Sequence, residues 1–358
     1  MAYISFQPSG NYKTHLYNGT GSSQAVTGLG FQPDVVWMKN RIDTRNHNLF
    51  DALRGVFMNL IVNTDAAEAS ATNSLTSFDS DGFTVQDSNE TNEAGGDGYG
   101  NWNWRMGTTT GIAGSPSITP TSYSFNAAAG QSIIRYTGNA VAGATVPHGL
   151  GVAPELIVVK TLDSSWSWPV YHVGMGATKY MYLDSTQAEL TDTSKWNDTA
   201  PTSTLFSLGT SGAGNASGDD YVAYCFAPIK GYSKFGAYTG NGNEDGAFIY
   251  TGFKPAFTLV KQTDAVNNWG MCDNQRNQNS DTQDGGKGNY TPHTLVTNAD
   301  GAESAYGSGA SNKQDYLSNG FKFKDGNPYG NESGSPYIYI AFAESPFVSS
   351  NSIPGTAR

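Results

Sequence analysis

Charged side chains are scarce in this chain of 358 residues, and positive charge is the scarcer sign. Asp, Glu, Lys and Arg make up 14% of the residues, and 20 Lys and Arg stand against 31 Asp and Glu, for a net charge of −11. A typical globular protein has about 25% charged residues. The basic residues are scattered and form no run. Because this balance repels nucleic-acid phosphates, we expect no nucleic-acid partner.

Cysteine and long hydrophobic runs are also in short supply. The two cysteines, Cys225 and Cys272, are too few for a disulfide framework, and no Cys-x-x-Cys spacing suggests a metal site. No stretch approaches the 18 apolar residues of a membrane span, so we expect no membrane insertion. The opening "MAYISFQPSG" lacks the basic and apolar regions of a secretory signal.

Glycine and aromatic residues, by contrast, are abundant. The chain has 43 Gly, 20 Tyr, 17 Phe and 7 Trp. So many aromatic residues can bury enough apolar surface to offset the entropy of folding, which argues against disorder. Short apolar runs separated by Gly, Asn, Asp and Ser turns are typical of an all-β protein.

One phrase occurs three times. "GLGFQPDVVWMK" ends at Lys39, "GLGVAPELIVVK" at Lys160 and "TGFKPAFTLVK" at Lys261, so the copies are 160 − 39 = 121 and 261 − 160 = 101 residues apart. These periods far exceed the roughly 20 to 50 residues of solenoid and propeller repeats. Each copy is therefore long enough to have its own core.

Other landmarks recur in the same order around each lysine. They are an earlier tyrosine (Tyr17, Tyr136, Tyr238), the eighth residue after the lysine (His47, Trp168, Trp269), the twelfth (Asp51, His172, Asp273), an aromatic that opens a strand (Phe83, Phe206, Phe321) and a tyrosine that opens the closing strand (Tyr99, Tyr221, Tyr337). In the closing strand of the second copy, period-two alternation predicts that Val222, Tyr224 and Phe226 point into a core. The lysine is expected to mark the point where its strand leaves the core.

The sequence therefore predicts three tandem antiparallel β-sandwich modules of the jelly-roll or concanavalin-like kind. We assign residues 1–110 to module 1, 111–230 to a linker plus module 2, 231–347 to module 3, and 348–358 to a surface tail. The linker is a Gly/Ser/Thr/Pro-rich segment that begins at Gly107.

No catalytic residues emerge from the sequence. Asp51 and Asp273 are replaced by His172 in the middle copy, which favours a structural hydrogen bond over a catalytic carboxylate. Asp79 and Asp81 fit the turn before a strand, and the third copy writes that turn differently. We expect a non-enzymatic protein without a cofactor.

Two candidate binding sites remain. The polar loop that follows Cys272 could offer oxygen ligands to calcium from Asp273, Asn277, Asp281 and Asp284, although the EF-hand order is absent and a solvated loop is the alternative. Aromatic residues crowd module 2 and could stack on sugar rings, although packing in the core is the alternative; they are Trp166, Trp168, Tyr180, Tyr182 and Trp196.

Several phrases resemble a family of structural proteins of tailed bacteriophages of the marine type, described as tail-fibre or tail-associated virion proteins. The phrases are "GFQPDVVWMKNR", "LFDALRG", "LTSFDSDGF", "GLGVAPELIVVK", "YVAYCFAPIKGYSKFGAYTGNG" and "GSPYIYIAFAESPF". The resemblance spans about Tyr12 to Phe347. The polar loop after Cys272 is longer than the resemblance leads us to expect.

The resemblance implies a virion component that is assembled in the host bacterial cytoplasm with other virion proteins. It also implies a homo-oligomer, with a trimer favoured. A tail fibre or receptor-binding subunit that contacts a host surface glycan or protein is the first hypothesis. A capsid decoration or head-fibre protein is the alternative, and a glycan depolymerase is a third.

Overall fold

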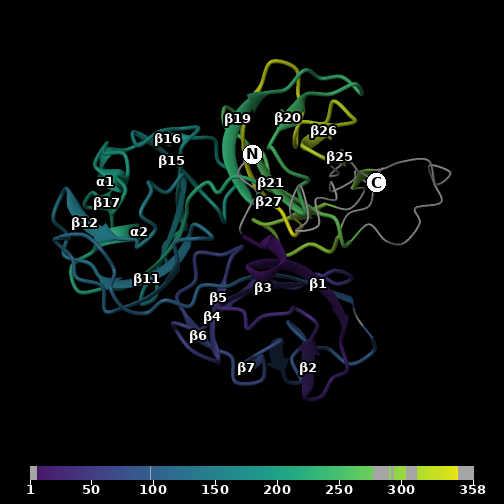
Figure 1. Cartoon of the computed structure of the whole chain (residues 1–358), viewed down its shortest axis with the longest axis horizontal. Helices are drawn as coiled ribbons and strands as arrows, with labels where there is room; N and C mark the ends of the chain where they lie inside the picture. The colour runs from purple at the N-terminus through teal and green to yellow at the C-terminus, as the bar shows by residue number, and fades with distance from the viewer. Residues whose placement is uncertain (1–5, 97, 277–289, 292–293, 304–312, 346–358) are drawn as a thin grey trace.

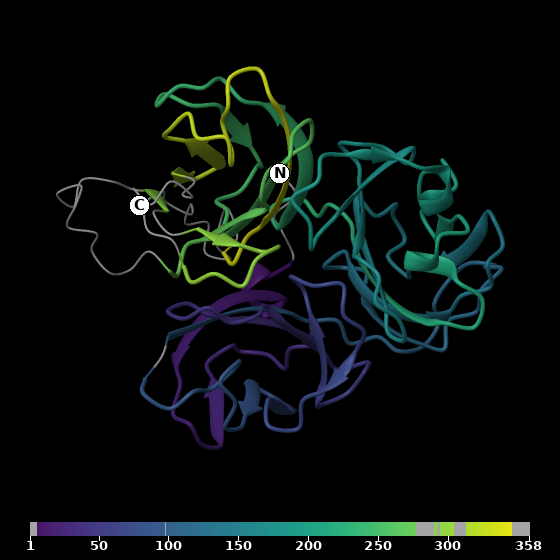
Figure 2. The same cartoon turned by 180° about the vertical axis from the view of Figure 1, so that it is seen from behind.

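The computed structural model describes residues 6–345 except 97, 277–289, 292–293 and 304–312. Its regular structure is almost entirely antiparallel β-sheet, which confirms the all-β sandwich fold. Three lobes surround a common centre, as Figure 1 and the view from behind in Figure 2 show. The chain passes through the lobes in order, from purple through teal to yellow.

Each lobe contains one large and one small sheet. In module 1 the large sheet has the order β1 (Tyr12–Asn18), β9 (Gly98–Trp104), β3 (Val35–Asn40), β4 (Asn48–Asp51), β5 (Met58–Ile61), β6 (Ala69–Ser70). The small sheet has the order β2 (Gln24–Thr27), β8 (Gly82–Val85), β7 (Leu75–Asp79). A short 3₁₀ turn, η1 (Pro8–Gly10), precedes β1.

Module 2 repeats this plan with one added edge strand. Its large sheet has the order β10 (Ser122–Asn126), β11 (Gln131–Thr137), β18 (Asp220–Phe226), β13 (Leu156–Thr161), β14 (Pro169–His172), β15 (Lys179–Tyr182), β16 (Leu190–Thr191). The small sheet pairs β12 (Ala144–Pro147) with β17 (Leu205–Leu208), and the two single-turn helices are α1 (Thr193–Trp196) and α2 (Gly212–Asn215).

Module 3 repeats it again. Its large sheet has the order β19 (Ser233–Thr239), β27 (Pro336–Phe342), β21 (Phe257–Gln262), β22 (Gly270–Asp273), β24 (Leu295–Val296). Its small sheet has the order β20 (Phe248–Tyr250), β26 (Gly320–Phe323), β25 (Gln314–Leu317), β23 (Tyr290–Thr291).

The modules share strand register as well as strand order. The apolar strand of the repeated phrase lies beside the closing strand in every copy, and the paired residues are Val35 with Trp104, Leu156 with Phe226, and Phe257 with Phe342. A register slip of one residue would turn every side chain to the opposite face of its sheet. The same landmarks therefore reach equivalent places in all three modules.

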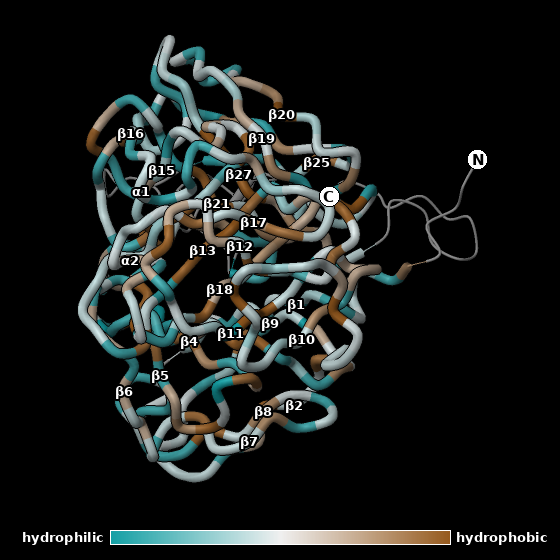
Figure 3. The backbone as a smooth tube through the Cα atoms, turned by 90° about the vertical axis from the view of Figure 1, so that its left-hand side faces the viewer, coloured by the Kyte–Doolittle hydropathy of each residue, from teal (hydrophilic) through white to brown (hydrophobic). Residues whose placement is uncertain are grey.

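The large sheets are covered on both faces. One face of each packs on the small sheet of its own module and forms a separate core. The opposite faces of all three meet at the centre of the molecule in one shared cluster. The hydrophobic colouring of Figure 3 is concentrated along inner strands such as β13 and β18. Because both faces are covered, these strands are continuous apolar runs.

An aromatic trio lies where the modules meet. Trp104, Phe226 and Phe342 occupy equivalent positions at the ends of the three closing strands. Their ring centroids are 5.6 to 6.1 Å apart, mostly edge to face, which is a favourable geometry for aromatic rings. Val222 and Tyr224 belong to the same cluster, so the alternation predicted for this strand is confirmed.

One local prediction is wrong. Lys39, Lys160 and Lys261 do not mark an exit from the core, because each is fully buried within its strand. The Gly/Ser/Thr/Pro-rich segment that begins at Gly107 contains β10, which pairs with β11. The Gly, Ser, Thr and Pro content of this segment gives no sign that β10 adds to the edge of the large sheet of module 2.

Candidate functional site

The polar landmarks of the repeat lie at the three seams, which we define as the interfaces between modules. The twelfth residue after each lysine contacts the closing strand of the next module. The contacts are Tyr224 Oη–H to Asp51 Oδ2 at 2.6 Å, His172 Nε2 to Tyr339 O at 3.1 Å, and Trp102 Nε1–H to Asp273 Oδ2 at 3.1 Å. Module 1 thus contacts module 2, module 2 contacts module 3, and module 3 contacts module 1. The structural hydrogen bond predicted for this position is confirmed.

The eighth residue after each lysine contacts the preceding module. The contacts are His47 Nε2 to Val296 O at 3.1 Å, Trp168 Nε1–H to Thr64 O at 2.9 Å, and Trp269 Nε1–H to Tyr182 O at 2.9 Å. A ring nitrogen therefore meets a main-chain carbonyl at every seam. Together the two sets close the modules into a ring rather than a string.

A third set of equivalent contacts comes from a glutamate in each module. Its main-chain N–H donates to the second residue after the lysine of the next module, from Glu68 to Leu162 O at 3.0 Å, from Glu189 to Thr263 O at 2.8 Å and from Glu303 to Arg41 O at 2.8 Å. Sequence reasoning missed this landmark. The signal was an Ala-Glu pair, at Glu68 and Glu189 29 residues after the lysine and at Glu303 42 residues after it.

A buried ion pair supports the seam residue in two modules. Arg54 Nε donates to Asp51 Oδ2 at 2.5 Å, and Arg276 Nε donates to Asp273 Oδ2 at 2.5 Å. The aspartates are fully buried and the arginines nearly so. Module 2 has His172 and, three residues later, Met175 in place of this pair. Both charges are lost together, so neither is left alone in the interior.

Three buried histidines have a defined tautomer. Nδ1 accepts an N–H in each, from Trp37 Nε1 to His47 at 3.0 Å, from Leu150 N to His148 at 3.2 Å and from Gly174 N to His172 at 3.0 Å. Nε2 must then carry the proton and donate to a carbonyl. Burial lowers the pKa of His148 and His172 to about 4, although the carbonyl contact of each raises it in part. A second proton would have to sit on Nδ1, where it would face the N–H group that this nitrogen accepts. The three rings therefore stay neutral at physiological pH.

The three equivalent lysines are held by main-chain carbonyls. Nζ of Lys39 donates to Asn40 O at 2.6 Å, that of Lys160 to Asp65 O at 2.9 Å and Trp166 O at 2.8 Å, and that of Lys261 to Gln262 O at 2.7 Å. Burial lowers the pKa of each to about 8, while nearby carboxylates raise it in part. Lys160 reaches across a seam, because Asp65 belongs to module 1. The lysines thus hold the turn that follows the repeated strand.

Stacked tyrosine pairs stabilise the interior of each module. The pairs are Tyr17 with Tyr99 at 5.0 Å, Tyr136 with Tyr221 at 5.2 Å, and Tyr238 with Tyr337 at 5.1 Å between centroids. A buried asparagine beside each pair accepts a main-chain N–H through Oδ1, and these residues are Asn92, Asn215 and Asn331. The tyrosines were predicted as landmarks, whereas the asparagines, six or seven residues before the closing tyrosine, were missed.

The aromatic residues proposed for glycan stacking do not share one surface. Trp168 belongs to the central cluster, and Tyr180 and Trp196 belong to the core of module 2. Tyr182 is half-buried against Tyr180, and Lys195 Nζ lies 5.0 and 5.5 Å from their ring centroids. Trp166, with 46% of its surface exposed, is the most accessible of the five.

The calcium candidates are described only in part. Asp273 is buried and paired with Arg276, and Asn277, Asp281 and Asp284 lie outside the described residues. Within the described ranges, no three His, Cys, Asp or Glu side chains gather closely enough to hold a metal ion. The same ranges contain no helix of the length and apolarity needed to cross a membrane.

The turn role predicted for Asp81 is confirmed. Its carboxylate accepts the N–H of Gly28 at 3.0 Å and of Gly30 at 2.5 Å. These main-chain bonds lower the pKa of Asp81. Gly28 and Gly30 have φ of +95° and +81°, a conformation that favours glycine, which explains the glycine pair that opens the phrase in module 1.

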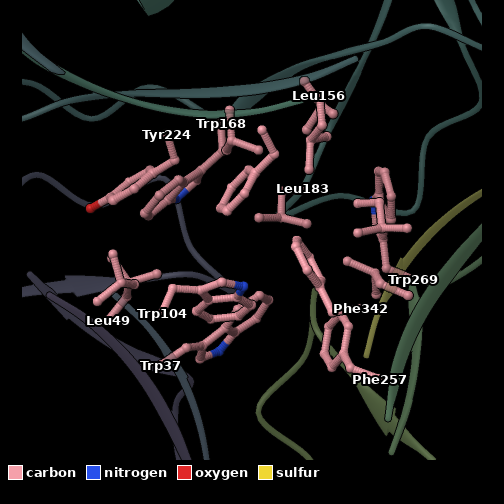
Figure 4. Close-up of a pocket in the computed structure, with 16 residues that line it drawn as sticks. Trp37, Leu49, Trp104, Leu156, Trp168, Leu183, Tyr224, Phe257, Trp269 and Phe342 are labelled. Carbon is pink, nitrogen blue, oxygen red and sulfur yellow. The ribbon is translucent and has the colours of Figure 1, made fainter. Parts of the chain in front are cut away.

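A cavity of about 70 Å³ lies where the three modules meet. Its walls come from β3, β4 and β9 in module 1, from β13, β14 and β18 in module 2, and from β21 and β27 in module 3. Trp168, Leu183 and Trp269, each next to a strand end, complete them. Figure 4 shows Trp37, Trp104, Trp168, Phe342 and Leu183 around this space. It combines side chains from all three modules, so it exists only when the ring is closed.

A family model matches residues 7–346 of the chain, and the family is described as a domain of unknown function, DUF7483. The match covers all three modules. Searches of curated proteins and of solved structures give no match.

Proposed function

The chain belongs to the DUF7483 family, and we propose that it is a non-enzymatic structural protein of a phage virion, most simply a tail-fibre or receptor-binding subunit that contacts the host cell surface. The main support for the proposal is that the repeated polar residues form contacts between modules. His47, Asp51, His172 and Asp273, with the residues equivalent to them, are engaged in contacts that join modules. A repeat whose polar residues join modules to one another is suited to a rigid structural protein.

The virion assignment rests on the resemblance of the repeated phrases to tail-associated phage proteins. On this proposal the chain is assembled in the host bacterial cytoplasm, acts alongside other virion proteins, and has a host surface glycan or protein as its ligand. A homotrimer remains part of the proposal. Because one chain already closes its own three-module ring, such a trimer would form through the outer faces of the modules.

Three experiments, on the phage that the proposal takes to encode this chain, test it. Antibodies against the folded chain, applied to intact particles, are expected to label the tail. Labelling of the head would support the capsid-decoration alternative instead, and absence from the particle would contradict a virion role.

Competition tests the receptor-binding part. Host cells treated with purified chain are expected to adsorb fewer phage particles than cells treated with the same chain unfolded by heat. Equal adsorption would contradict receptor binding. Release of new reducing ends from host polysaccharide would contradict the non-enzymatic assignment and favour a depolymerase.

A further inference from the structure

We propose that the cavity at the centre of the ring is a binding site for a small, uncharged aromatic molecule. The cavity measures about 70 Å³, several times the roughly 15 Å³ that one water molecule needs. Sixteen residues line it, all of them aliphatic or aromatic, and none has more than 9% of its surface exposed. Its walls are apolar throughout, and apolar cavities stay dry and bind molecules such as benzene or xenon.

The polar atoms of the walls are turned to other partners, with one exception. Tyr224 Oη donates to Asp51, and the indole N–H groups of Trp168 and Trp269 donate to carbonyls across the seams. A water molecule in the cavity would therefore find few hydrogen-bond partners. The exception is Trp104, whose buried Nε1–H has no hydrogen-bond partner among the described residues.

The unpaired indole N–H of Trp104 limits the chemical classes of ligand that suit the cavity. An aromatic ring is apolar enough for the walls and can accept an N–H on its π face. A saturated ring of similar size has no such face. We therefore expect benzene to bind more tightly than cyclohexane, and ions and sugars to be rejected, because a charged or strongly polar ligand would lose its hydration.

The space arises from small side chains contributed by module 2. Trp37, Val158 and Leu259 occupy equivalent positions, and Val158 is the smallest of the three. Val170 likewise is smaller than Met271 at the equivalent position of module 3. Both valines line the cavity, so the modules fill the centre unequally and leave room on the side of module 2.

The test is a thermal-shift and titration experiment on the full chain with benzene and cyclohexane as probes. Benzene is expected to raise the melting temperature in a concentration-dependent way, and Val158→Leu is expected to weaken benzene binding at least tenfold because the added methylene fills the space. Val152→Leu is the matched control, because Val152 is 46% exposed and does not line the cavity; it should bind benzene as the parent does.

Three results would overturn the proposal: no shift with benzene, unchanged binding in Val158→Leu, or equal loss in Val152→Leu. Equal binding of cyclohexane and benzene would overturn the assignment of an aromatic ligand. If Val158→Leu does not fold, crystals of the parent chain under xenon pressure decide the matter. Xenon located among Trp37, Trp104 and Trp168 supports the site, and its absence there contradicts it.

Discussion

At the residue scale, the buried histidines make the folded state sensitive to acid. The unfolded chain takes up protons on histidine near pH 6.5, whereas folded His148 and His172 do so only near pH 4. Between these values the unfolded state binds more protons, so stability falls as the pH falls. Each of these histidines should lower the free energy of unfolding by about 1.4 kcal/mol per pH unit in that window.

Comparison with His172→Asn isolates one of these contributions. Buried carboxyl groups such as Glu344, whose pKa is raised by burial, change stability in the opposite direction, so the overall slope is a mixture. We expect the parent chain to lose about 1.4 kcal/mol more than the variant per pH unit between pH 6 and 4.5. Urea unfolding at several pH values measures this difference, and parallel slopes would contradict a neutral buried His172.

The aspartate–arginine pairs yield a second prediction at this scale. Asp273→Asn removes the nearer carboxylate of buried Arg276 and leaves only Glu303, 3.4 Å away, beside that charge, so the variant should lose about 3 kcal/mol of stability. Asp245→Asn is the matched control, because Asp245 pairs with Lys322 at the surface, where water and salt screen the pair and it contributes little to stability. Denaturant unfolding of both variants is the measurement. Similar losses in the two would contradict a structural role for the buried pair.

At the scale of the element, each closing strand is fixed by its first tyrosine. Tyr337 Oη donates to Pro328 O at 2.8 Å and accepts the N–H of Glu332 at 2.9 Å. Tyr337→Phe leaves both main-chain groups without this partner, and we expect a loss of about 1 to 3 kcal/mol. Tyr250→Phe, at a residue 58% exposed, should change stability by less than about 0.5 kcal/mol. Chemical denaturation distinguishes the two; equal effects would refute the role of the Tyr337 hydroxyl.

The strands themselves were predictable from the sequence, because turn residues and alternation report burial directly. The repeated phrase predicted β3, β13 and β21, and the alternation in "YVAYCF" predicted the inner face of β18. The buried lysines were not predictable in this way. A lysine at a strand end is ordinarily solvated, and only the three-dimensional turn supplies the carbonyls that receive Nζ.

At the scale of the whole molecule, the sequence predicted the three modules and the order in which they occur, but not their closure into a ring. The landmarks at Trp168 and Trp269 were visible as a pattern, yet their partners, Thr64 O and Tyr182 O, are main-chain atoms that carry no sequence signal. Exposed and buried aromatic residues also look alike in a sequence. Only the fold separates Trp166 at the surface from Trp168 at the centre.

The shared centre makes the modules dependent on one another. A module taken alone would expose the face that carries its part of the central cluster, including Phe226 in module 2 and Phe342 in module 3. Burial of apolar surface contributes roughly 25 cal/mol per Å² to folding, so loss of these contacts should leave single modules weakly stable. The ring is therefore expected to unfold as one unit.

Scanning calorimetry of the full chain tests this dependence most directly. A closed ring predicts one cooperative transition, with calorimetric and van't Hoff enthalpies that agree, and a shift of that whole transition by Asp273→Asn. Two or three separable transitions, with Asp273→Asn affecting only one of them, would show three independent sandwiches and contradict the closed ring.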